Sequence, residues 1–147
     1  MPPQGGGGGG PLFVWKEKEI QTSTQKIQTI PETKAIISQI PQNFVFRETL
    51  KFGQRSLNVK YLQIFLKSQG PEIYPEGLVT GYFGPKTFLA VKRFQQKYWE
   101  EILKPLGLTK EQATGFVGKM TIKKINEILN QIRGDLTSFF EKLKFKL

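Results

Sequence analysis

Apolar residues recur every three or four positions in three stretches of this 147-residue chain, residues 59–66, 87–98 and 122–132. Such spacing places the side chains of each stretch on one face of an α-helix. The three stripes consist of Val59, Leu62, Leu66, Thr87, Val91, Phe94, Tyr98, Ile122, Ile125, Ile128, Leu129 and Ile132. Three helices of this length can enclose one small core, so the pattern predicts an all-α, three-helix bundle.

Two glycine-bounded turns, Gly81–Gly84 and Gly115–Gly118, precede the second and third stretches. Glycine suits turn positions where φ is positive or where two backbone segments approach closely. Pro85 follows the first turn, and its fixed φ suits the first position of a helix. Asn58 is the expected N-cap of the first helix, because its side-chain oxygen can accept a hydrogen bond from a free backbone amide. Gly70 is expected to end that helix.

Residues 1–42 are expected to form a flexible, mostly disordered tail. Six consecutive glycines beginning at Gly5 have high chain entropy and no side chain to bury, as in a linker. One short helix is compatible with the segment between Glu32 and Ser38. The first residues contain neither a basic start nor an apolar run, so we expect an export signal and an attached domain upstream of this sequence.

The folded domain is expected to span residues 43–133, with Phe44–Phe46 as a short extended lead-in that packs onto the helices. The apolar pattern of residues 134–147 predicts an additional amphipathic helix, and Asp135 can serve as its N-cap. Its apolar positions are Leu136, Phe139, Phe140 and Leu143. We expect this helix to pack on the core, and the alternative is a basic segment that rests on a membrane surface or on a partner protein.

The composition excludes most catalytic chemistry. The chain has no Cys and no His, which removes Ser-His-Asp and Cys-His nucleophiles and zinc sites built on thiolate or imidazole. Asp135 is the only Asp, and the Glu residues lie mostly in charged stretches or beside prolines, where nothing raises the pKa of one of them. A pair of Glu residues is the remaining catalytic alternative. We therefore expect a non-catalytic protein without a metal or a cofactor.

The ordered set of helix and turn residues resembles the peptidoglycan-binding (PGBD-like) module, a small three-helix domain that anchors proteins to bacterial walls. The matching residues are Leu50, Gly53, Val59, Leu62, Gln63, Leu66, Gly70, Gly81, Phe83, Gly84, Thr87, Ala90, Val91, Phe94, Gln95, Gly115, Val117, Gly118 and Thr121. The likeness covers residues 44–132. So many matches at compatible spacing are far more specific than a lone short motif.

Three departures from the family pattern affect the expected ligand-binding rim. Ser56 stands where a second glycine is usual, and Asn58 and Thr80 stand where acidic residues are usual. Residues 99–114 form a longer connection before the last turn than compact members have. None of these departures interrupts a helix, but the two missing carboxylates leave the ligand preference open.

The resemblance implies that the chain binds peptidoglycan in a shallow groove with aromatic groups and with cations for the stem-peptide carboxylates. The candidate ligand-binding residues are Tyr82, Tyr61, Tyr98, Trp99, Arg55, Lys86 and Lys119. Tyr82 lies in the first glycine turn, where a ligand platform and a half-buried structural role are both open. Gln63 and Gln95 are expected to hydrogen-bond the backbone at the turns rather than a ligand.

The chain is basic, with 22 Lys and Arg against 12 Asp and Glu, a net charge of +10. Residues 49–132 hold 13 basic and 6 acidic side chains and therefore carry +7 of this charge. A basic domain attracts polyanions, which include peptidoglycan carboxylates, anionic wall polymers and nucleic acids. We prefer wall binding to nucleic-acid binding, because no helix has a dense arginine stripe and no nucleic-acid-binding motif is present.

The resulting hypothesis is a monomeric, extracytoplasmic wall-binding module that anchors an attached protein to the bacterial cell wall or surface. No run approaches the roughly 20 consecutive apolar residues that span a bilayer. A structural or protein-interaction module that kept the fold but lost glycan binding is the main alternative, and a basic nucleic-acid-binding domain is the second.

Overall fold

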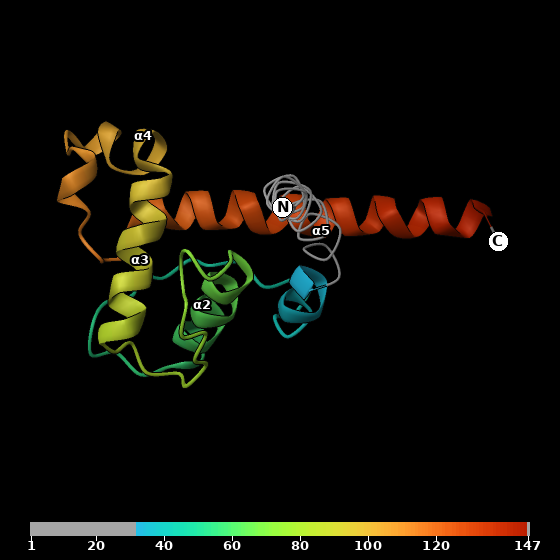
Figure 1. The fold of residues 1–147 in the computed structure, drawn as a ribbon, viewed down its shortest axis with the longest axis horizontal. Coiled ribbons are helices and arrows are strands. Elements are labelled where there is room, and N and C mark those ends of the chain that lie inside the picture. The colour runs from blue at the N-terminus through green and yellow to red at the C-terminus, as the bar shows by residue number, and fades with distance from the viewer. Residues whose placement is uncertain (1–31, 147) are drawn as a thin grey trace, which may run out of the picture. The chain divides into compact units, whose positions relative to one another are not determined.

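A computed structural model of the chain describes residues 32–146, so the predicted glycine-rich tail lies outside the described residues. Its main helices are α2 (Leu57–Ser68), α3 (Pro85–Lys97) and α5 (Lys119–Lys146) (Figure 1). The connection between α3 and α5 holds α4 (Trp99–Ile102) and two 3₁₀ turns, η1 (Lys104–Leu106) and η2 (Lys110–Gln112). The part of the chain that the structure describes contains helices and no strand, which confirms the predicted all-α fold.

The three main helices share one hydrophobic core, as their apolar stripes predict. Phe65 of α2 and Phe94 of α3 meet edge to face, with ring centroids 5.5 Å apart. Ile125 and Leu129 of α5 are buried in the same cluster. Each fully buried side chain of this size stabilises the fold by about 1.5–3 kcal/mol, so these contacts are the main source of stability.

The helix α2 begins two residues earlier than expected, and its N-cap is Ser56 rather than Asn58. The Ser56 hydroxyl accepts a hydrogen bond from the Val59 amide at 3.2 Å. The Ser56 amide in turn donates to the carbonyl of Gly81 at 3.0 Å, which holds Ser56 in the extended conformation of a cap. Asn58 lies inside the first turn and donates to the Glu48 carboxylate at 3.2 Å. Both residue types can cap a helix, and the long-range contact decides which one does.

The compact unit that holds the helices begins before residue 43, where the sequence pattern placed the start of the domain. The compact unit starts at Lys34, which lies inside a helical segment that covers residues 32–37. Ile37 and Ile40 are each only 3% exposed and belong to the core. Residues 34–42 are thus part of the domain rather than of a linker.

The lead-in Phe44–Phe46 is docked onto α5. The Phe46 amide donates to Asn126 Oδ1 at 3.0 Å, and the Phe46 carbonyl accepts from Asn126 Nδ2 at 2.9 Å. Arg133 of α5 also donates to the Phe44 carbonyl at 3.0 Å. Further along, Leu50 and Val117 form an isolated antiparallel bridge. These contacts hold the second glycine turn and α5 against the N-terminal segment.

The helix α5 is continuous from Lys119 to Lys146 and runs across the predicted boundary between residues 133 and 134. Gly134 and Asp135 are exposed within this helix, and Asp135 does not begin a new one. Glycine ends a helix when it adopts a positive φ, and Gly134 does not. The residues after Gly134 are helical as predicted, and what they contact stays a prediction.

Candidate functional site

The buried side chain of Gln63 in α2 fixes the first glycine turn. Its Oε1 accepts hydrogen bonds from the amides of Thr80 and Gly81, both at 2.8 Å. Its Nε2 donates to the Tyr82 carbonyl at 2.8 Å and to the Thr87 hydroxyl at 3.0 Å. Gln63 is 1% exposed, so its amide group stabilises the turn and is not accessible to a ligand.

Gln95 in α3 holds the second turn in the same way. Its Oε1 accepts from the amides of Thr114 at 3.0 Å and Gly115 at 2.9 Å. Its Nε2 donates to the Phe116 carbonyl at 2.8 Å and to the Thr121 hydroxyl at 3.1 Å. The near-repeat in the sequence is therefore a repeat of one hydrogen-bonded unit, with a buried Gln, a glycine turn and a Thr in the next helix.

Both turns require glycine at their first bend and place an aromatic ring over their last residue. Gly81 and Gly115 have φ values of +81° and +74°, which favour glycine. The Tyr82 ring lies 3.1 Å from the position that a Cβ at Gly84 would occupy. The Tyr82 ring therefore lies against its own turn and is half-buried.

Arg55 and Tyr82 form a cation–aromatic pair beside the first turn. The Arg55 guanidinium carbon lies 4.9 Å from the centre of the Tyr82 ring. The two residues also form an isolated antiparallel bridge, and the neighbouring Phe83 amide donates to the Gln54 carbonyl at 2.8 Å. Arg55 is exposed and Tyr82 is half-buried. The backbone thus fixes an exposed guanidinium over an aromatic face before any ligand arrives.

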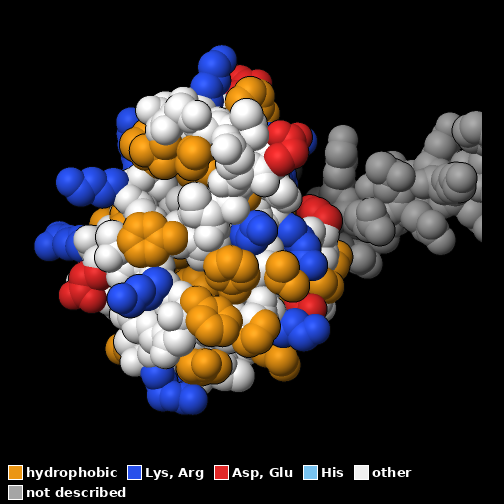
Figure 2. Space-filling view, turned by 90° about the vertical axis from the view of Figure 1, so that its left-hand side faces the viewer, with side chains coloured by type: hydrophobic (Ala, Val, Ile, Leu, Met, Phe, Trp, Pro, Cys, Tyr) orange, Lys and Arg blue, Asp and Glu red, His pale blue; other side chains and the backbone are white. Residues whose placement is uncertain are grey.

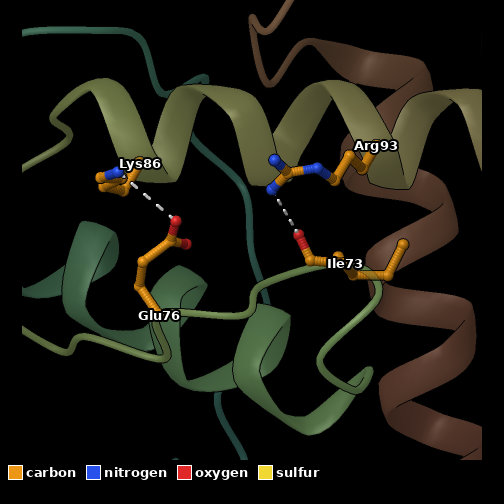
Figure 3. Close-up of polar contacts among 4 residues, drawn as sticks. All are labelled: Ile73, Glu76, Lys86 and Arg93. Carbon is orange, nitrogen blue, oxygen red and sulfur yellow. Dashed lines mark hydrogen bonds and ion pairs between the residues drawn. The ribbon is translucent and has the colours of Figure 1, made fainter.

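The cations of α3 reach toward the loop that follows α2 (Figure 3). Lys86 Nζ lies 3.7 Å from Glu76 Oε1, and Arg93 donates to the Ile73 carbonyl at 3.3 Å. The other Glu76 oxygen is buried and accepts no hydrogen bond from the described residues. The charge of Lys86 therefore balances a partly buried carboxylate, which leaves Arg55 as the cation most available at the first turn.

Four of the seven predicted ligand-binding residues lie elsewhere. Tyr61 packs against Phe44 with ring centroids 4.7 Å apart and supports the lead-in. Lys119 is exposed at the start of α5, beside the second turn. Tyr98 and Trp99 lie where α3 meets α4. The structure therefore brings together Arg55, Tyr82 and Lys86, and it does not join the seven residues into one site.

Tyr98 belongs to a charged cluster next to α4. Lys124 of α5 lies 4.9 Å from the centre of the Tyr98 ring, and its Nζ is 2.8 Å from Glu101 Oε2. The hydrogen bond with Glu101, together with the nearby negative charges, raises the pKa of Lys124 above its ordinary value of 10.5. Lys124 is therefore engaged within the domain.

Sequence reasoning did not single out the exposed aromatic residues around the second turn. Phe52 and Phe116 are 52% and 43% exposed, and the Phe52 ring meets the Phe88 ring at 6.0 Å. Lys92 lies 5.8 Å from the Phe88 ring. Figure 2 shows a face on which apolar side chains gather next to lysine and arginine side chains. Phe52 and Phe116 lie outside the helical stripes, so periodicity gave no signal for them.

A protein-family model described as "Putative peptidoglycan binding domain" matches residues 55–98. No curated protein and no solved structure shows a significant match to the chain. Among the described residues, no helix is long and apolar enough to cross a membrane. The matched segment holds α2, the first glycine turn and α3, and with them Gln63 and the Arg55–Tyr82 pair. The match confirms the resemblance over residues 55–98, which are similar to the peptidoglycan-binding domain family.

Proposed function

We propose that this chain is a non-catalytic module that binds peptidoglycan outside the cytoplasm and anchors an attached protein to the bacterial wall. The observation that carries the proposal is the pair of exposed Arg55 and half-buried Tyr82, because it lies on the turn of the segment that matches the family model. The chain contains no His and no Cys, and Glu76 and Glu101 are paired with lysines, which supports a binding role.

The pair suits the chemistry of the wall polymer. An aromatic ring offers apolar surface to the apolar face of a sugar ring, and a guanidinium can donate hydrogen bonds to the sugar oxygens. Because the backbone bridge already orients both groups, binding loses less conformational entropy than binding by mobile side chains. The net charge of +7 over residues 49–132 attracts an anionic polymer to this surface.

Retention on purified, insoluble peptidoglycan at moderate salt tests the proposal. Tyr82→Ala is expected to weaken retention about tenfold, the loss of an aromatic contact of about 1.5 kcal/mol, while the unfolding transition persists. Arg55→Gln is expected to weaken retention about threefold. Leu57→Ala is the matched control, because Leu57 is exposed on α2 outside the pair.

The competing functions predict different results in the same assay. If unmodified protein is not retained, the domain is an interaction module that has lost wall binding. If DNA competes for binding, and if rising salt releases protein from DNA and wall together, the basic charge alone explains binding. Retention at a salt concentration that releases the protein from DNA supports the proposal.

A further inference from the structure

The long connection between α3 and α5, residues 99–114, is folded and lies outside the segment that the family model matches. Ile102 and Leu103 anchor it in the core with at most 1% exposure. Gly107 turns the chain after η1 with a φ of +76°. The family likeness assigns no role to this connection, and its outer side forms two pockets against α5.

The first, here called the apolar pocket, has a volume of about 220 Å³. Leu106, Phe116, Met120 and Lys119 are among its lining residues. Leu106 and Phe116 are 58% and 43% exposed, so their apolar surface is accessible to a ligand. None of the ion pairs among the described residues includes Lys119, and the first turn of α5 has no acidic residue.

The second, here called the charged pocket, has a volume of about 310 Å³ and shares Met120 with the apolar pocket. It is lined by two lysines and two glutamates, Lys123, Lys124, Glu101 and Glu127. Lys124 binds both carboxylates, with Nζ–Oε distances of 2.8 and 3.6 Å. The two pockets adjoin at Met120 and are here together called the depression: the apolar pocket is lined by Lys119 among its apolar residues, and the charged pocket presents both signs of charge.

We infer that this depression binds the peptide stem of the wall polymer rather than its glycan strand. This inference rests on the proposed function. A sugar ring that enters the apolar pocket buries the hydroxyl groups of its edge against Leu106, Phe116 and Met120, which offer them no hydrogen-bond partner. A peptide that ends in small aliphatic side chains and a free carboxylate places its methyl groups against Leu106, Phe116 and Met120. Its terminal carboxylate then reaches Lys119.

The charged pocket fits the preceding part of the same ligand. A stem residue that carries both an amino group and a carboxylate finds Glu101 and Lys123 of opposite charge along one pocket. The first glycine turn and this depression thus divide the polymer between them, with the glycan strand at Arg55 and Tyr82 and the peptide along α4, η1 and α5.

The test uses the soluble tripeptide diacetyl-L-lysyl-D-alanyl-D-alanine and its C-terminal amide, titrated into the full chain. Backbone amide NMR signals of Thr114, Phe116 and Lys119 are expected to shift with the tripeptide. The amide is expected to bind about fivefold more weakly, because it lacks the charge that Lys119 pairs with. Absence of shifts in this region, or equal affinity for acid and amide, overturns the inference.

Two variants test whether the tripeptide binds in the apolar pocket. Leu106→Glu adds a carboxylate at an exposed position of the apolar pocket, and we expect it to weaken tripeptide binding at least fivefold with the unfolding transition unchanged. Lys119→Gln is expected to remove the difference between acid and amide. Lys60→Gln is the matched control, because Lys60 is an exposed lysine on α2 outside both pockets. Unchanged binding by Leu106→Glu contradicts the inference.

Peptidoglycan from which an amidase has removed the stem peptides separates this inference from the proposed function. Weaker retention on stripped than on intact peptidoglycan supports the inference. Equal retention on both overturns the inference and leaves the proposed function standing. No retention on either material overturns the proposed function itself.

Discussion

At the scale of single residues, two buried glutamines decide how the turns of this domain are held. Gln63 and Gln95 each accept from two consecutive backbone amides and donate to a carbonyl and a threonine hydroxyl. A glutamine amide has both an acceptor and two donors, so one side chain can satisfy a whole turn. A carboxylate lacks the donors, and an apolar residue lacks both.

Replacing Gln63 by Leu should leave the amides of Thr80 and Gly81 without their protein partner. We expect the free energy of unfolding to fall by about 2–3 kcal/mol, measured by urea denaturation. Gln96→Leu is the control, because Gln96 is half-buried on α3 and donates and accepts no side-chain hydrogen bond in the described structure. Equal losses in the two variants would show that the turn does not depend on Gln63.

Gly115 of the second turn and Gly107 after η1 form a matched pair for a test of backbone strain and side-chain overlap. Gly115 and Gly107 have nearly the same φ, +74° and +76°, but a Cβ at Gly115 would overlap the Phe88 ring, whereas one at Gly107 would meet nothing within 4 Å. Gly107→Ala should cost about 1 kcal/mol for the left-handed backbone alone. Gly115→Ala should cost at least about 2 kcal/mol more, because the aromatic ring must move.

Thermal and urea unfolding of both variants measure this difference. If Gly115→Ala does not fold, Phe88→Ala in the same chain removes the obstructing ring and should restore folding. No difference between the two glycine variants would show that Phe88 yields without cost.

At the scale of elements, α5 combines two roles in one helix. Its first turns pack Ile125 and Leu129 into the core, whereas Gly134 and Asp135 are exposed further along. Its 28 residues extend over about 42 Å. Where a helix lacks core contacts, its own helix propensity contributes more to its stability, so an exposed glycine weakens it most.

Gly134→Ala should therefore stabilise α5 by about 0.5–1 kcal/mol, because a Cβ at this position meets nothing within 4 Å and alanine is the better helix former. Amide hydrogen exchange of residues 134–146 and helical circular dichroism measure the effect. Gly134→Pro should do the opposite, since proline removes a helical hydrogen bond. A fall in helicity with alanine would contradict a continuous helix through Gly134.

At the scale of the whole molecule, the family segment depends on residues outside it. The core that contains Phe65 and Phe94 also contains Ile37 and Ile40 before the segment and Leu129 after it. The backbone of Phe46 hydrogen-bonds the Asn126 side chain of α5, and the backbone of Leu50 hydrogen-bonds that of Val117 just before α5. The chain from residue 34 onward is therefore one compact unit, and the rigidity of the first glycine turn depends on the whole unit.

Tyr74, in the loop between α2 and α3, makes the free energy of unfolding depend on pH in the alkaline range. Tyr74 is buried, and its hydroxyl donates to the Leu78 carbonyl at 2.6 Å. Burial raises the pKa of Tyr74 above its ordinary value of 10.0. The folded state thus favours the protonated phenol, so this contribution to stability is present below the unfolded-state pKa of 10.0 and is lost as pH rises through the higher folded-state value.

We expect the free energy of unfolding to fall as the pH rises above about 10, and to fall less steeply in Tyr74→Phe, which has no ionisable group there. Urea denaturation at a series of pH values measures both slopes. Other tyrosines and lysines ionise in the same pH range. The test is therefore the difference in slope between the unmodified protein and Tyr74→Phe. Identical slopes would contradict a raised pKa at Tyr74.

The sequence by itself determined the features that depend on local spacing. Three helices follow from the apolar period of Val59, Leu62 and Leu66 and its two counterparts, because a stripe of this period can be buried only when the segment is helical. The bends at Gly81 and Gly115 follow from the freedom of glycine at positive φ. The family resemblance followed from the same residues, since they recur in a fixed order.

Only the tertiary structure decided the features that depend on which distant segments meet. Ser56 caps α2 because Gly81 holds its backbone extended, and Ile37 joins the core because α5 and the lead-in give it a surface to pack on. The seven candidate residues are aromatic or cationic, but only Arg55, Tyr82 and Lys86 lie in or beside the first glycine turn. The pockets beside α5 arise because residues 99–114 fold against a helix that follows them in the chain. Contacts of this kind have no local period, and for that reason the sequence pattern alone could not place them.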